Sequence, residues 1–197
     1  TVGNDFTMSA GTVTLPTATT TIAGSFTNAG GVFAHNNGQL YFTSASAETL
    51  TLGGTAFTNA FYNARFTGAG SWAFTEANAT TSNLFRITQG NVTLPSNTLT
   101  VGNTFTNSGG TFAHNSGTVK FISSGIRSID TNASFNSLRF TGTGSFSFVD
   151  SSVTALGSVT ITAGTTTLPS GTFSIGGSLT NSARIAHNNG TVLFNST

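Results

Sequence analysis

The sequence predicts an all-β protein, a parallel β-solenoid of about eight coils, and three observations support this fold class. The segment FTNAGGVFAHNNG (26–38) returns as FTNSGGTFAHNSG (105–117) and again as LTNSARIAHNNG (179–190). A shorter element, in which apolar and polar residues alternate, recurs between these copies. Thr, Ser, Asn, Gly and Phe dominate the composition, and runs of helix-forming residues are missing. Internal repeats of this kind are typical of solenoids, propellers and arrays.

The long repeat covers nearly the whole chain. The phrase VTLP, which ends at Pro16, recurs with its end at Pro95 and then as TTLP with its end at Pro169. These prolines define a 74–79-residue internal repeat. The segment 63–74 likewise returns at 137–148. Because the repetition runs from end to end without a linker, we expect residues 1–197 to form one repetitive domain.

Eight short elements mark the expected coils. Each starts with a small residue and then alternates, so that its third and fifth residues point to one side. They are 18–22, 38–42, 70–74, 97–101, 117–121, 144–148, 171–175 and 190–194. The expected inward column is Leu40/Phe42, Trp72/Phe74, Leu99/Val101, Val119/Phe121, Phe146/Phe148, Phe173/Ile175 and Val192/Phe194, with Thr20 beside Ile22 as its one polar member.

The spacing of these elements sets the expected coil length. Steps of about 20 residues suffice for one coil, longer steps of about 27 to 32 residues would carry an extra loop, and three coils would make one long repeat. The alternative fold is an antiparallel β-sandwich subunit, because Asn37-Gly38 and Asn189-Gly190 are signals for type I′ hairpins. The same corner in the copy at 105–117 reads Asn115-Ser116-Gly117. It does not share that turn type and therefore favours the solenoid.

Composition narrows the function classes. Only 6% of the residues are charged, the formal net charge is +1, and cysteine is absent, so disulfides and thiol chemistry are excluded. No stretch approaches the roughly 20 apolar residues that span a bilayer. The six cations are scattered along the sequence, which argues against nucleic acid as a partner. They are Arg65, Arg86, Lys120, Arg127, Arg139 and Arg184.

The sequence predicts no catalytic, cofactor-binding or metal-binding residues. His35, His114 and His187 occupy one place in the three copies, and copies three coils apart would lie about 14 Å apart along the axis, too far to share a metal ion. We expect them to satisfy backbone groups of a repeated corner. The acidic residues Asp5, Glu48, Glu76, Asp130 and Asp150 match no common strand position, so a carboxylate pair for glycoside hydrolysis is not expected.

Outward residues suggest two surface functions. Tyr41 should point outward and could stack on a sugar, whereas Trp72 falls in the inward column and is expected in the core. Ranks of Thr-x-Thr would indicate ice binding, but only Thr19/Thr21 and Thr98/Thr100 among the eight elements fit that pattern. Glycan binding and, less strongly, ice binding are therefore alternatives.

Both ends of the sequence lie inside the repeat, since residues 1–7 resemble residues 100–106. We expect a processed protein or a segment of a longer chain. Neither end resembles a capping repeat, and uncapped solenoid ends expose strand edges. The expected partner is therefore the protein itself, stacked head to tail, or neighbouring repeats.

The phrases LTVGNTFTNSGGTF (99–112), GTVKF (117–121) and FNSLRFTGTGSFSF (135–148) resemble repeats of bacterial adhesin-like and filamentous-haemagglutinin-like β-solenoid surface proteins. The resemblance lies in composition and rhythm over most of the chain. It implies an extracellular or cell-surface setting and a role in adhesion, coating or filament formation. Our expectation is an extracellular structural protein of a filament. The alternative is an adhesin stalk or surface-binding module.

Overall fold

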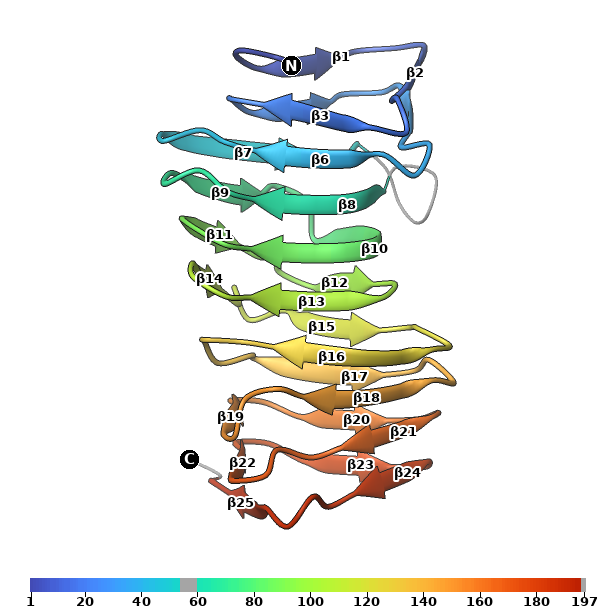
Figure 1. Cartoon of the computed structure of the whole chain (residues 1–197), viewed down its shortest axis with the longest axis vertical. Coiled ribbons are helices and arrows are strands. Elements are labelled where there is room, and N and C mark those ends of the chain that lie inside the picture. Colours follow the sequence, from blue (N-terminus) through green and yellow to red (C-terminus); the bar gives the residue numbers. More distant parts are fainter. Residues whose placement is uncertain (54–59, 196–197) are drawn as a thin grey trace.

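The computed structural model describes residues 1–53 and 60–195, and within these ranges every regular element is a β-strand. Short strands form coils that are stacked along the long axis, with the N-terminus at one end and the C-terminus at the other (Figure 1). Every strand pairing in the described ranges is parallel and joins one coil to the next. The β-solenoid is thus confirmed, and the antiparallel sandwich is wrong. None of the described residues belongs to a helix that could span a membrane.

Each coil has three sides, which we call faces one, two and three in the order in which the chain meets them. Face one holds β1 (Phe6–Met8), β4 (Phe26–Asn28), β7 (Ala47–Thr51), β9 (Ser71–Phe74), β11 (Asn91–Thr93), β14 (Thr111–Ala113), β19 (Val153–Ala155), β22 (Thr172–Ile175) and β25 (Thr191–Phe194). On face one, Phe135 takes the place between β14 and β19. Its ring packs 5.3 Å from that of Phe112, and its backbone forms a bridge to Ala155.

The other two faces form one continuous hydrogen-bonded sheet over most of their length. Face two holds β2 (Thr12–Thr14), β5 (Val32–Ala34), the start of β10 (Asn78–Ile87), β12 (Thr98–Val101), β15 (Thr118–Phe121), β17 (Ser137–Phe140), β20 (Val159–Ile161) and β23 (Leu179–Asn181). Face three holds β3 (Thr19–Ile22), β6 (Gln39–Phe42), β8 (Phe61–Phe66), the end of β10, β13 (Thr104–Asn107), β16 (Ile126–Asp130), β18 (Ser145–Phe148), β21 (Thr165–Thr167) and β24 (Arg184–Ala186). A register shift between Thr81 and Leu84 lets β10 pair with β12 and then with β13.

Nine coils are present rather than eight, counted as the nine strands of face three within the described ranges. The eight sequence elements do not mark one coil each. They fall on β3, β6, β9, β12, β15, β18, β22 and β25, which belong to all three faces. A longer step between elements, such as that from β9 to β12, is therefore one coil plus one further face. The further face, more than an extra loop, therefore accounts for the longer steps within the described residues. The longest step, from β6 to β9, includes residues 54–59, so the loop expected there lies outside the described residues.

The true coil length is read from the strand registers. Phe6 pairs with Phe26 and Phe26 pairs with Leu50, so the second of these coils is longer than the first. The additional residues form the corner before β7, where the buried Ser44 Oγ accepts the Ser46 N–H at 3.0 Å. The same corner recurs before β16, where the Ser123 Oγ accepts the Gly125 N–H at 3.2 Å.

The long repeat does not span three coils either, because its copies lie on different faces. The VTLP motif begins in β2 on face two, returns in β11 on face one, and returns again in β21 on face three. Each copy of the repeat is thus turned by a third of a revolution relative to the previous one. The expectation that copies lie above one another, three coils apart, is wrong for this reason.

The predicted inward register is confirmed along the rod. Leu40, Phe42, Trp72, Leu99 and Phe146 are all buried, as are the other members of the column except those of β25 and the polar Thr20, which is partly exposed. In-register phenylalanines stack on successive coils. Ring centroids are 5.0 Å apart in Phe6–Phe26, 5.0 Å in Phe42–Phe66, 5.3 Å in Phe85–Phe105 and 5.2 Å in Phe121–Phe140. Such pairs contribute about 0.5–1.5 kcal/mol beyond the area they bury.

Candidate functional site: coil ends and outer faces

Within the described residues, the last strand of the inward column, β25, is exposed. Phe194 occupies the same place in β25 as Phe42 in β6 and Phe121 in β15, yet it is 58% exposed where those two are 0% exposed. Leu193 beside it is 45% exposed, and Val192 is partly buried against the core. Phe194 pairs with Ile175 on the coil below, so it lies in the inward column with nothing described above it.

The N-terminal end is also apolar. Val2, Phe6 and Val13 are partly buried and pack against the core. Within the described residues, β1, β2, β23, β24 and β25 each pair with one neighbouring strand, and β3 has only the Val2 bridge on its outer side. Among the described residues, the outermost strands therefore have one edge without a strand partner, and such edges are templates for pairing with a further strand.

The three histidines lie at turns, as expected. His35 Nδ1 accepts the Asn37 N–H at 3.0 Å, His114 Nδ1 accepts the Ser116 N–H at 3.0 Å, and His187 Nδ1 accepts the Asn189 N–H at 3.1 Å. The expectation that these side chains satisfy backbone groups of a repeated corner is confirmed. The turns follow β5, β14 and β24, so the three histidines lie at three different corners of the rod.

The hairpin signal has a physical explanation in these turns. Asn36 and Asn37 both have positive φ, of 46° and 58°, and the Gly38 N–H donates to the His35 carbonyl at 2.8 Å. Two successive positive φ values are the pattern of a type I′ turn. Here the turn joins faces two and three instead of two antiparallel strands, because β5 and β6 each pair with the neighbouring coils.

The environment of His35 differs from that of its two counterparts. Its ring stacks on Tyr62 with centroids 5.2 Å apart. Burial lowers the pKa of His35 from its ordinary value. No set of three or more His, Cys, Asp or Glu residues in the described ranges could hold a metal ion.

Three of the acidic side chains, Asp5, Asp150 and Glu48, accept hydrogen bonds from a neighbouring coil, and Glu48 also accepts one from its own corner. Asp5 Oδ1 accepts the Ser25 N–H at 2.9 Å, and Asp150 Oδ2 accepts the Thr131 N–H at 2.7 Å. Glu48 accepts the hydroxyls of Ser25 and Ser44, at 2.8 and 2.7 Å.

Two acidic residues that sequence reasoning treated as unrelated, Asp130 and Asp150, lie on successive coils. Burial and then Asp150 raise the pKa of Asp130, and Arg86 opposes them. The two aspartates are separated in the sequence by the length of one coil, which was the signal that could have shown this proximity.

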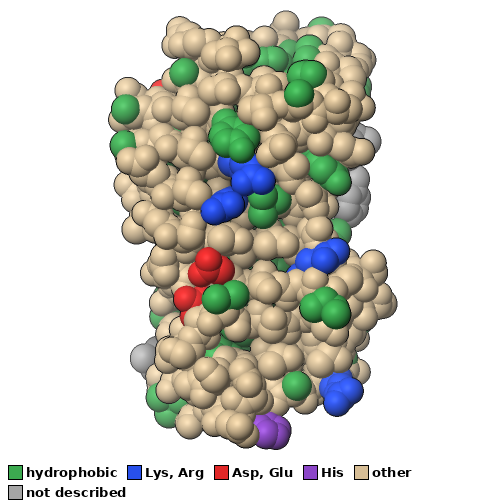
Figure 2. All heavy atoms as spheres, viewed as in Figure 1, with side chains coloured by type: hydrophobic (Ala, Val, Ile, Leu, Met, Phe, Trp, Pro, Cys, Tyr) green, Lys and Arg blue, Asp and Glu red, His purple; other side chains and the backbone are tan. Residues whose placement is uncertain are grey.

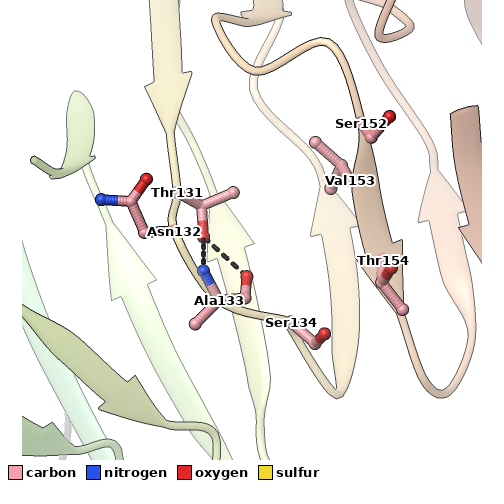
Figure 3. A pocket seen from close by; sticks show the side chains of 7 residues that line it. All are labelled: Thr131, Asn132, Ala133, Ser134, Ser152, Val153 and Thr154. Carbon is pink, nitrogen blue, oxygen red and sulfur yellow. Dashed lines mark hydrogen bonds between the residues drawn. The ribbon is translucent and has the colours of Figure 1, made fainter. Parts of the chain in front are cut away.

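A shallow hollow of about 280 Å³ lies on face one where the β14 ladder is interrupted. Hydroxyl and amide side chains from two segments, 131–134 and 152–154, line it (Figure 3). The Thr131 hydroxyl donates to the Ala133 carbonyl and accepts the Ala133 N–H, and the Asn132 side chain is directed away from the 152–154 segment. The lining contains no charged side chain.

The aromatic candidates lie where the register predicts. Trp72 is fully buried, and Tyr41 is half-buried on the outside of face three. The Arg65 guanidinium carbon lies 5.6 Å from the centre of the Tyr41 ring, and Arg65 Nε donates to Gln39 Oε1 at 3.0 Å. Tyr41 is therefore part of a cationic cluster.

The threonines do not form one continuous plane in the described ranges, because the eight elements belong to three faces. The register on face two gives one outward column, Thr80, Thr100, Lys120, Arg139, Thr160 and Thr180. Lys120 and Arg139 interrupt the threonines in the middle of this column.

Four of the six cations form two pairs that sequence reasoning missed. Arg65 and Arg86 are directly opposite in the register of β8 and β10, and Lys120 and Arg139 are directly opposite in that of β15 and β17. In the view of Figure 2, basic side chains lie in the middle part of the molecule next to a small acidic group, and one further basic side chain lies near the lower end. The members of each pair are separated in the sequence by one coil length, which was the available signal.

Comparisons with protein-family models, with curated proteins and with solved structures found no match to this chain.

Proposed function

We propose that this chain is an extracellular structural protein that forms, or belongs to, a filament in which β-solenoid coils stack end to end. The observation that carries the proposal is the exposed inward column at the C-terminal end. Phe194 is 58% exposed, whereas its counterparts Phe42 and Phe121, with a coil above them, are 0% exposed. A further coil would bury Phe194 in the same way.

End-to-end stacking would bury apolar side chains and pair strand edges at the same time. Full burial of a phenylalanine side chain contributes about 1.5–3 kcal/mol, and the strand edges of three faces would gain backbone partners. The N-terminal end offers matching features, namely partly buried apolar side chains and unpaired strand edges. The covering coil would belong to a second copy of this chain or to further repeats of the same polypeptide.

The extracellular setting is part of the same proposal. Its support is the resemblance of the repeat phrases to those of bacterial surface proteins, together with a surface that relies on Thr, Ser and Asn instead of charges. Treating intact cells with a protease tests it: loss of the intact chain without cell lysis is expected, and full protection would contradict the proposal.

The test of stacking is a pair of matched variants. Phe194→Asp should abolish filaments, because it places a charge in the contact between coils. Val149→Asp is the control, since Val149 is 64% exposed but lies beside face three, away from both ends. Both changes introduce the same charge at an exposed apolar position, so both proteins should fold.

The measurement is cryo-electron microscopy with light scattering at raised concentration. Wild type and Val149→Asp should give filaments with a meridional reflection near about 4.8 Å, the strand spacing, and Phe194→Asp should stay monomeric. A monodisperse wild-type monomer would contradict polymerisation of this chain. Filaments from Phe194→Asp would show that the ends are not the contact.

A second candidate function is attachment to a glycan or another surface. The half-buried, outward Tyr41 with Arg65 beside its ring favours it. Binding of a monodisperse, non-polymerising protein to a glycan array would support this function in place of the filament.

A further inference from the structure

We propose that the two cation pairs, Arg65/Arg86 on face three and Lys120/Arg139 on face two, bind the carboxylate groups of an acidic polysaccharide. The pairs are defined by the strand register, in which Arg65 is the partner of Arg86 and Lys120 the partner of Arg139. Neighbouring strands lie about 4.8 Å apart, so each pair presents two positive charges on the outside of adjacent coils.

The pairing is unfavourable for the isolated protein. Like charges directly opposite each other on neighbouring strands destabilise a sheet. The chain has only six Lys and Arg residues among 197, and the two pairs together hold four of them. An anion between the two members of a pair would turn this repulsion into attraction.

Arg86 is only partly exposed, and its Nε is buried and has no hydrogen-bond partner among the described residues. A carboxylate outside the rod would therefore bind the exposed part of the guanidinium group, which donates charge-assisted hydrogen bonds to such acceptors.

The surroundings fit a sugar polymer better than a nucleic acid. The face-three column runs Thr21, Tyr41, Arg65, Arg86, Thr106 and Asp130. Hydroxyl groups flank the cations and can bond to sugar hydroxyls. Asp130, two coils beyond Arg86, would repel any anionic chain that continued along this column, so an anion is held only at the cation pair.

The long repeat carries one member of each pair. Arg65 and Arg139 occupy the same place in the motif RFTGAGS (65–71) and RFTGTGS (139–145). Their partners differ, because Arg86 lies on the coil after Arg65 and Lys120 on the coil before Arg139. The two pairs lie on faces three and two, and a polymer that contacted both would bind more strongly than one that contacted a single pair.

The test uses oligogalacturonate and its fully methyl-esterified form, which differ only in the carboxylate charge. Calorimetry should show binding of the free acid, weakened by salt, and no binding of the ester. Arg86→Gln and Arg139→Gln should each weaken binding about tenfold, the value of one charge-assisted contact. Arg184→Gln is the matched control, because it removes the same charge from an exposed residue outside both pairs.

Three results would overturn the proposal. Equal binding of acid and ester would show that carboxylates are not recognised. An equal loss of affinity in Arg184→Gln would show that only net charge matters. Single-stranded DNA that binds as tightly as the oligosaccharide at the same salt would show general polyanion binding. Circular dichroism of each variant confirms that the fold is retained.

Discussion

Two asparagines at the same place in the long repeat, Asn28 and Asn107, are fully buried in the inward register of β4 and β13. Asn28 Nδ2 donates to the carbonyls of Gly31 and Leu52, each at 3.0 Å, and its Oδ1 accepts the N–H groups of Gly30 and Gly31. Among the described residues, Asn107 Oδ1 accepts the Gly110 N–H at 3.2 Å, and Asn107 Nδ2 has no partner. The side-chain amide of Asn28 is thus fully hydrogen-bonded, whereas that of Asn107 is only partly hydrogen-bonded.

The difference predicts unequal costs of removal. Asn28→Ala should lower the free energy of unfolding by about 3 kcal/mol, because it leaves several buried backbone groups without partners. Asn107→Ala should cost about 1 kcal/mol, since an unsatisfied amide is removed together with one hydrogen bond. Denaturant unfolding of the two variants checks this, and equal losses would contradict the assignment of hydrogen bonds.

At the scale of the element, the His-Asn turn allows a comparison between its copies. The second positive-φ position holds Asn37 at 58° in the first copy and Asn189 at 58° in the last copy, but Ser116 at 60° in the middle copy. Asparagine tolerates this left-handed conformation better than serine does.

Ser116→Asn should therefore stabilise the protein by about 0.5 kcal/mol, and the reciprocal change Asn37→Ser should destabilise it by a similar amount. Both side chains are exposed, so packing does not change. The midpoint of thermal unfolding is the measurement. Shifts of the same sign in the two variants would show that another property of the site dominates.

The strands themselves were largely predictable from the sequence, and the coils were not. Alternation placed Phe42, Trp72 and Phe146 inward, and all three are buried. It could not tell which face a strand occupies, because all three faces use the same alternation. Coil membership depends on corner lengths, such as the longer corner at Ser44, whose buried hydroxyl closes a turn through hydrogen bonds that composition does not reveal. For the same reason the cation pairs were not visible before the register was known.

At the scale of the whole molecule, the rod should lengthen in fixed steps. Duplicating the segment 92–165, one copy of the long repeat, adds eleven strand positions, because the VTLP motif moves from face one of one coil to face three of a later one. These positions are the ten strands from β11 to β20 and the position of Phe135 on face one. Eleven positions at three per coil are three and two-thirds coils, or about 18 Å at about 4.8 Å per coil. Small-angle scattering of the monomeric Phe194→Asp background should show this increase in length. An unchanged length would contradict continuous stacking.

The rotation of the long repeat by a third of a turn also affects how faithfully the chain can fold. Identical segments of a repetitive sequence invite mispairing, because a slipped arrangement can bury the same side chains. Here, segments in contact are one coil apart along the chain and differ in sequence, as with Trp72 and Val92. The near-identical copies that could be exchanged for one another are kept on separate sides of the rod. To pair two such copies wrongly, the chain would have to rotate about the rod axis as well as shift along it. Because the long repeat is not a whole number of coils, mispaired coils are therefore disfavoured.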